Sequence, residues 1–144
     1  MKKSVFLLIS VFFITTNSLC SQDITGKWAT IDDNTGKKRS IVEVYKKGGK
    51  YFGKVVDMYL EPHEDPDPVC DLCSDNRKDQ KIRGMEIIQN MEQTGNEYTG
   101  GEILDPENGK VYRCKLWVED GKLMVRGYIA FFFRTQEWLR HVPR

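Results

Sequence analysis

The chain has 144 residues, with 22 Lys or Arg against 21 Asp or Glu, so its formal net charge is +1. A charge this close to zero produces no long-range field toward nucleic acid or anionic lipid, and we exclude a nucleic-acid-binding function. Once the leader described next is removed, the length suits one domain with one modest hydrophobic core.

Residues 1–21 have the features of a secretory signal peptide. Two lysines precede an apolar run at residues 5–14, and small or polar residues follow it. The run is too short to span a bilayer, which takes about 20 residues of helix. We expect export to the periplasm or beyond, no membrane span and a mature domain at residues 22–144. Lipid attachment at Cys20 is disfavoured, because the residues directly before it do not fit a lipid-attachment sequence.

The mature part consists of short β-branched and aromatic runs that alternate with turn sequences such as Asn-Thr-Gly and Asp-Pro-Glu-Asn-Gly. We predict strands at residues 26–32, 40–46, 51–58, 85–91, 97–104, 110–118, 122–129 and 134–140. Eight antiparallel strands are enough to close an up-and-down β-barrel whose interior holds side chains or one small ligand. No long amphipathic helical period occurs, so we do not expect an α/β sheet with crossover helices.

The longest interval between predicted strands, residues 59–83, contains three of the five prolines among acidic residues. We expect an irregular excursion over the surface or across a barrel mouth. An oxidising compartment favours a disulfide between Cys70 and Cys73, with plain packing as the alternative. A metal site is disfavoured, because structural zinc usually takes four ligands and there is no second cysteine pair. Cys114 shares the apolar face of its strand and is expected to be buried.

Three ordered motifs connect the mature chain to a known family. They are Gly-Lys-Trp at residues 26–28, Gly-Glu-Ile-Leu-Asp-Pro-Glu-Asn-Gly-Lys-Val-Tyr at 101–112, and Val-Arg-Gly-Tyr-Ile followed by Arg-Thr-Gln-Glu-Trp-Leu-Arg within 125–140. Together they resemble the exported bacterial family known as domain of unknown function 2147. The resemblance implies a lipocalin-like barrel and export, and it carries over no catalytic residue. The chain departs from the family pattern at residues 130–133, where three phenylalanines stand in place of an expected glycine or small polar residue.

A Gly-x-Trp on the first predicted strand and an arginine on the last also resemble the arrangement that closes lipocalin barrels. We expect Trp28 to cover one end of the barrel. The guanidinium of Arg134 or Arg140 would stack on its indole and bond to nearby carbonyls. This role is structural.

Catalysis has few candidate residues. The only histidines, His63 and His141, are not next to a plausible nucleophile. No nucleophile elbow, zinc-binding His-Glu-x-x-His helix or phosphate-binding glycine loop occurs. We therefore predict a protein that is not an enzyme and has no cofactor or bound metal.

The barrel interior is the best candidate for a binding site. Arg126 and Tyr128 lie two residues apart on one strand, so they share a face on which they would jointly hold a carboxylate. The alternative is that this face points to solvent, because alternation does not say which face is inside. Further candidates for the pocket lining are Phe52, Val56, Met58, Trp117, Met124, Phe131 and Phe133.

Two functional hypotheses follow. The first is an exported protein that binds a small lipophilic molecule, such as a fatty acid or another carboxylate, inside the barrel. The second is a filled barrel that acts through a protein partner or as a structural module of the cell envelope. The cavity volume distinguishes them, because only the first requires a hollow barrel.

Overall fold

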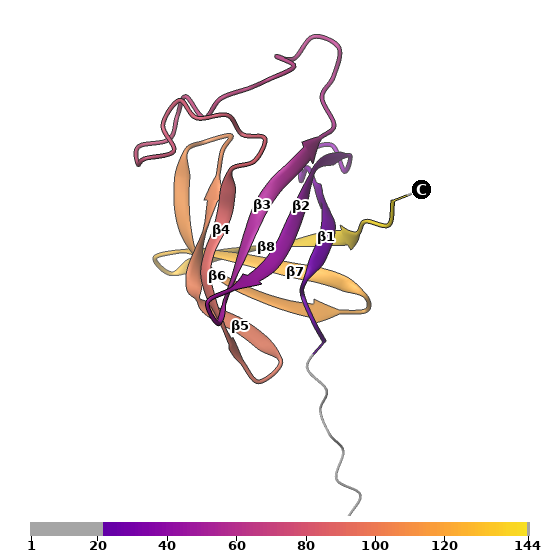
Figure 1. Cartoon of the computed structure of the whole chain (residues 1–144), viewed down its shortest axis with the longest axis vertical. Helices are drawn as coiled ribbons and strands as arrows, with labels where there is room; N and C mark the ends of the chain where they lie inside the picture. The colour runs from indigo at the N-terminus through magenta and orange to yellow at the C-terminus, as the bar shows by residue number, and fades with distance from the viewer. Residues whose placement is uncertain (1–21, 144) are drawn as a thin grey trace, which may run out of the picture.

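The computed structural model describes residues 22–143, so the predicted signal peptide lies outside the described residues. Eight antiparallel strands form a closed barrel in which each strand pairs with its neighbours in sequence and β1 pairs with β8 (Figure 1). The strands are β1 (Gly26–Ile31), β2 (Lys38–Lys47), β3 (Lys50–Met58), β4 (Glu86–Thr94), β5 (Glu97–Asp105), β6 (Lys110–Glu119), β7 (Lys122–Ile129) and β8 (Phe132–Arg140). This confirms the predicted all-β barrel. No helix within residues 22–143 is long and apolar enough to cross a bilayer.

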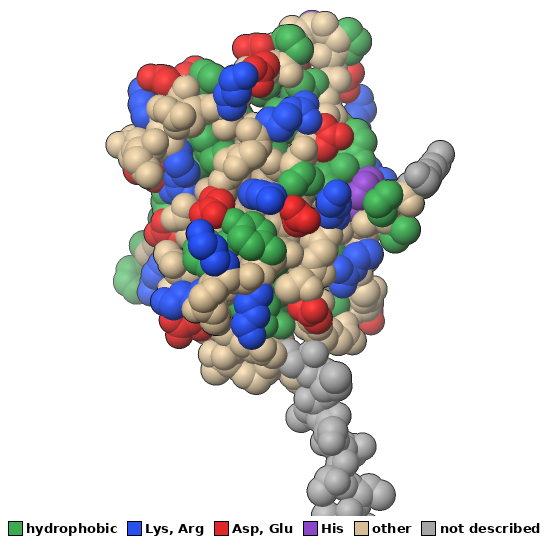
Figure 2. All heavy atoms as spheres, in the orientation of Figure 1, with side chains coloured by type: hydrophobic (Ala, Val, Ile, Leu, Met, Phe, Trp, Pro, Cys, Tyr) green, Lys and Arg blue, Asp and Glu red, His purple; other side chains and the backbone are tan. Residues whose placement is uncertain are grey.

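Charged side chains of both signs are interspersed over the face shown in Figure 2, as the near-zero net charge leads us to expect. Hydrophobic side chains on this face lie between them in small groups.

The β7–β8 connection is shorter than the sequence indicated. Ile129 pairs with Phe132, so only Ala130 and Phe131 form the turn, and β8 begins two residues before its predicted start. Ala130 has φ 49°, a conformation that favours glycine. The departure from the family pattern thus leaves the pairing of β7 and β8 intact and puts an alanine where a two-residue hairpin usually has glycine.

The barrel is closed at the end where the chain enters β1. The Arg140 guanidinium carbon lies 3.8 Å from the ring centroid of Trp28, and Arg140 Nη1 donates to the Thr25 carbonyl at 2.8 Å. Trp28 is fully buried, and its Nε1 donates to the Ile24 carbonyl at 2.8 Å. Of the two arginines considered for this position, Arg140 occupies it, and Arg134 lies near the opposite end.

Inward-facing side chains pack the half of the barrel next to Trp28. They include Val42, Val44, Tyr51, Met91, Tyr98, Leu116 and Leu123, all almost completely buried. On β7 the buried positions are Leu123 and Val125, so the alternate positions face outward. This closed half is the solid core that holds the open half in shape.

Residues 59–85, which connect β3 to β4 at the open end, form an ordered excursion held by backbone hydrogen bonds. Cys70 N donates to the Gln80 carbonyl and Ile82 N to the Pro68 carbonyl, both at 2.9 Å. Cys70 and Cys73 form the predicted disulfide.

The disulfide loop packs on the turn between β5 and β6. A Cβ added at Gly109 would lie 1.9 Å from the Leu72 carbonyl oxygen, and Cys70 Sγ is 3.7 Å from the Pro106 carbonyl oxygen. Gly109 also has φ 70°. Only glycine allows this approach, which fixes the excursion against the rim of the barrel.

Candidate functional site

A cavity of about 500 Å³ occupies the half of the barrel opposite Trp28. Its walls are the inward-facing residues of the strands, and its mouth is bordered by three turns and by the excursion, which contributes Leu60, Pro68 and Ile82. The other apolar side chains of the lining include Val55, Met58, Ile87, Ile103, Leu104, Val125, Ile129, Phe132, Phe133 and Trp138. A concave, mostly apolar space of this size is typical of small-molecule sites.

The polar side chains of the lining bond to one another. Thr30 and Ser40 share a hydrogen bond between hydroxyls at 2.8 Å. Trp138 Nε1 donates to Gln136 Oε1 at 3.0 Å, and Gln136 Nε2 donates to Asp33 Oδ2 at 2.6 Å. These internal bonds hold the polar groups in fixed positions, so the walls are shaped before any ligand binds.

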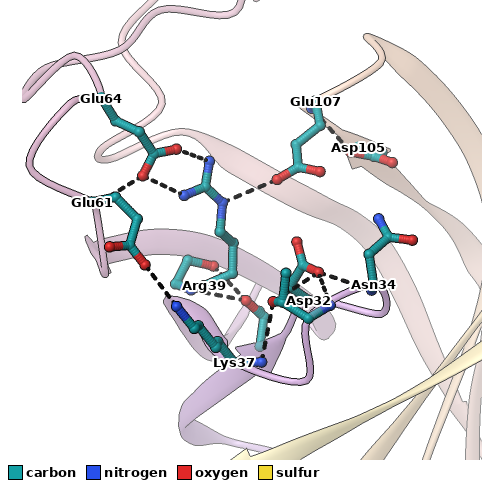
Figure 3. Close-up of polar contacts among 11 residues, drawn as sticks. Asp32, Asn34, Lys37, Arg39, Glu61, Glu64, Asp105 and Glu107 are labelled. Carbon is teal, nitrogen blue, oxygen red and sulfur yellow. Dashed lines mark hydrogen bonds and ion pairs between the residues drawn. The ribbon is translucent and has the colours of Figure 1, made fainter.

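An ion-pair cluster spans the mouth (Figure 3). Arg39 Nε donates to Glu107 Oε1 at 3.0 Å, and Arg39 Nη1 donates to Glu64 Oε2 at 2.9 Å. Beside it, Lys37 pairs with Glu61 at 3.1 Å. The hydrogen bond from Arg39 lowers the pKa of Glu64, so the carboxylate stays ionised. Since Glu64 belongs to the excursion and Glu107 to the β5–β6 turn, Arg39 on β2 connects both segments across the mouth.

Two aspartates hold the turns that border the cavity. Asp32 Oδ1 accepts backbone N–H groups of Thr35 at 2.7 Å and Asn34 at 2.8 Å, and these bonds lower the pKa of Asp32. Asp105 Oδ1 accepts the backbone N–H of Glu107 at 3.0 Å, while burial raises the pKa of Asp105. Both carboxylates therefore shape the mouth through backbone contacts.

The prediction that Arg126 and Tyr128 face the interior is wrong, because both lie on the outer wall. Arg126 stacks on two outward aromatic rings, 4.9 Å from the Trp117 centroid and 4.4 Å from the Phe133 centroid, and its Nε donates to Thr135 Oγ1 at 2.7 Å. The inward-facing residues of β7 are the alternate ones that include Leu123 and Val125, and none of them is charged. That difference in polarity was the signal available in the sequence, because an unpaired arginine is rarely buried.

The other candidates for the pocket lining are divided between the outer wall and the cavity. Phe52, Trp117 and Met124 are outside the cavity, as are Val56 and Phe131. Phe52 stacks on Tyr45 at 6.1 Å between ring centroids, again on the outer wall. Of the residues considered from the sequence, Met58 lines the cavity, and Phe133 borders its mouth with its ring on the outer wall.

Cys114 is buried in the inner wall between Gly101 and Gly127 of the neighbouring strands. Burial raises the pKa of the Cys114 thiol to about 12, so the thiol is protonated at neutral pH and is a poor nucleophile or metal ligand. Over residues 22–143, no three His, Cys, Asp or Glu side chains are grouped to hold a metal ion.

The sequence did not point to the residues that border the mouth. Arg39 meets Glu64 and Glu107, which are 25 and 68 positions away along the chain. No local pattern connects residues so far apart. The Asp-Pro-Glu-Asn-Gly motif indicated a tight turn, but the contact between that turn and β2 depends on closure of the barrel.

A family model described as "Uncharacterized protein conserved in bacteria (DUF2147)" matches residues 26–140. The chain belongs to the DUF2147 family. The match runs from the first residue of β1 to the last residue of β8, so it covers the whole barrel. It confirms the resemblance that the three sequence motifs indicated.

The fold of this DUF2147 member is similar to that of protein HP1028 from Helicobacter pylori, which is described as belonging to the lipocalin family. The TM-score is 0.71, over 83% of this chain and 84% of the other, at 17% sequence identity. The likeness establishes a lipocalin-like fold. No curated protein matches the sequence.

Proposed function

We propose that this DUF2147 protein carries a small, largely apolar and uncharged molecule in the barrel. The observation that supports this most directly is the cavity of about 500 Å³, which is apolar in its walls and open at one end. The opposite end is packed solid and covered by Trp28. A barrel that is hollow at one end favours a carrier over a filled module that acts only through its surface.

The charges around the cavity favour an uncharged ligand over a carboxylate. Among the described residues, the basic side chains that line the cavity are Arg39 and Arg134. Both are already paired with carboxylates: Arg39 with Glu64 and Glu107, and Arg134 with Asp33. A fatty acid would have to displace one of these partners. Arg126, the residue first considered as an anchor for an acid, lies outside the cavity.

Export of the protein is part of the proposal. The Cys70–Cys73 disulfide is of a kind that persists in oxidising compartments. This agrees with the signal peptide predicted from the sequence at residues 1–21.

A blocking substitution at Gly127 tests the carrier function. Gly127 lies in the cavity wall on β7, and a Cβ added there meets Tyr112 at 3.4 Å, an ordinary contact. Gly127→Phe therefore places a ring in the cavity without a clash of the backbone. We expect the wild type to bind the neutral probe N-phenyl-1-naphthylamine with a rise in fluorescence, and Gly127→Phe to weaken this binding at least tenfold.

Arg126→Ala is the matched control on the same strand. Because Arg126 lies on the outer wall, the substitution should leave probe affinity unchanged. Native mass spectrometry of the purified protein, before and after extraction with organic solvent, would identify a ligand that copurifies. Absence of probe binding by the wild type, or equal binding by Gly127→Phe, would contradict the carrier function.

A further inference from the structure

The β7–β8 hairpin ends in three consecutive phenylalanines that are not covered by the rest of the protein. Phe131 is 98% exposed, Phe132 78% and Phe133 61%. Phe132 and Phe133 also border the mouth of the cavity. Folding normally removes such side chains from water, and a contiguous exposed group of them marks an interaction site.

The shape of this tip favours insertion into a lipid bilayer over contact with the flat surface of a protein partner. Phe133 lies on the outer wall under Arg126, Phe132 lies on the cavity side, and Phe131 is in the turn itself. The tip is thus apolar on both faces of the hairpin. Figure 1 shows this hairpin reaching the left edge of the barrel, away from the excursion at the top. A protein partner usually covers one face of a sheet, whereas the hydrocarbon region of a bilayer surrounds an inserted tip.

Basic residues predominate on the strands next to the tip even though the net charge of the chain is close to zero. Residues 110–118 and 121–136, which form most of β6, all of β7 and the first half of β8, contain no Asp or Glu. Their basic residues are Lys110, Arg113, Lys115, Lys122, Arg126 and Arg134. Lys115, Lys122 and Arg134 have carboxylate partners. Among the described residues, the other three form no ion pair.

Arg126 already contacts Phe133, and the pairing of the strands brings Arg113 next to the phenylalanines as well. Arg113 on β6 pairs with Tyr128 on β7, which pairs with Phe133 on β8, so all three side chains share the outer wall. On its other side Arg113 pairs in register with Glu102 on β5, whose carboxylate lies 4.0 Å from Arg77. Apolar rings with arginines at their base match the composition of segments that bind at a lipid–water interface.

From this tip we propose that the protein docks on an anionic lipid bilayer, with the β7–β8 hairpin inserted and the basic residues of β6 and β7 at the level of the lipid headgroups. Insertion buries the phenylalanines, and the headgroup charge is complementary to Lys110, Arg113 and Arg126. Because Phe132 and Phe133 border the cavity mouth, a docked barrel opens toward the lipid. Passage of a ligand between the bilayer and the cavity would rest on the proposed carrier function, while the docking itself does not.

Flotation with vesicles tests the docking. The mature protein is mixed with vesicles of equal parts phosphatidylglycerol and phosphatidylcholine, or of phosphatidylcholine alone. We expect binding to the anionic vesicles that weakens in high salt and is much weaker without phosphatidylglycerol. Phe131→Ser should lower the partition coefficient about tenfold, the factor expected for one phenylalanine side chain. The control Val142→Ser removes another exposed apolar residue, 74% exposed, far from the tip, and should change nothing.

Two further variants test separately the contribution of the basic charges to docking and its independence from the cavity. The double variant Lys110→Gln/Arg113→Gln should lose about fivefold per charge on anionic vesicles only. Gly127→Phe should bind vesicles like the wild type, so failure of the carrier function and failure of docking are distinguishable. Docking is refuted if the wild type does not float with anionic vesicles, or if Phe131→Ser and Val142→Ser behave alike. Lipid-free self-association that Phe131→Ser abolishes would overturn it in favour of a second copy of the chain.

Discussion

Replacing Arg140 with alanine should destabilise the barrel by about 1.5 to 3 kcal/mol, because two interactions at the closed end are lost together. The guanidinium carbon sits 3.8 Å from the centroid of the buried Trp28 ring, and a cation–π contact from an exposed guanidinium contributes about 0.5 to 1 kcal/mol. Nη1 also donates to the Thr25 carbonyl at 2.8 Å, and a hydrogen bond from a charged group contributes about 1.5 to 3 kcal/mol. The two contributions overlap, so we expect less than their full sum.

Urea denaturation without reductant, followed by tryptophan fluorescence, measures the change in unfolding free energy. Arg134→Ala is the matched control, because the sequence did not distinguish the two arginines. Arg134 is mostly exposed and pairs with Asp33 at the surface, so its loss should cost less than about 1 kcal/mol. Arg140→Lys keeps the charge without the planar group and should recover only part of the stability. Equal losses for Arg140→Ala and Arg134→Ala would refute this account of barrel closure.

Three further substitutions or measurements probe the open end and the inner wall. Gly109→Ala should cost about 3 kcal/mol or more in urea unfolding, because its Cβ would meet the Leu72 carbonyl oxygen. Gly36→Ala, at similar φ in open space, should cost only about 1 kcal/mol, and similar losses for the two would argue against the close contact. Ala130→Gly should raise the unfolding free energy by about 0.5 to 1 kcal/mol through relief of its positive φ, and a loss of stability would show that glycine is not preferred there. The Cys114 thiol, with its pKa raised to about 12 by burial, should resist iodoacetamide at neutral pH until the protein is unfolded, and labelling of the native protein would contradict its burial.

The strands and their order could be predicted from the sequence because both depend on local patterns. Alternation of side chains locates a strand, and turn residues such as those at Gly36 and Gly109 separate one strand from the next. Strands joined by short turns pair with their neighbours, which leads to a closed meander. The predicted Cys70–Cys73 disulfide is equally local, since the two residues are three positions apart.

Tertiary structure decided which face of each strand is inside and which residues meet at the mouth. Alternation with a period of two does not by itself say which face of a strand is inside, and the predicted inward position of Arg126 on β7 was wrong. The inner surface is defined only once the barrel has closed. The meeting of Arg39 with Glu64 and Glu107 joins β2 to two distant segments, and the selection of Arg140 over Arg134 depends on where β8 meets β1. Local sequence determines backbone conformation, but contacts between distant residues exist only once the sheet has curved and closed.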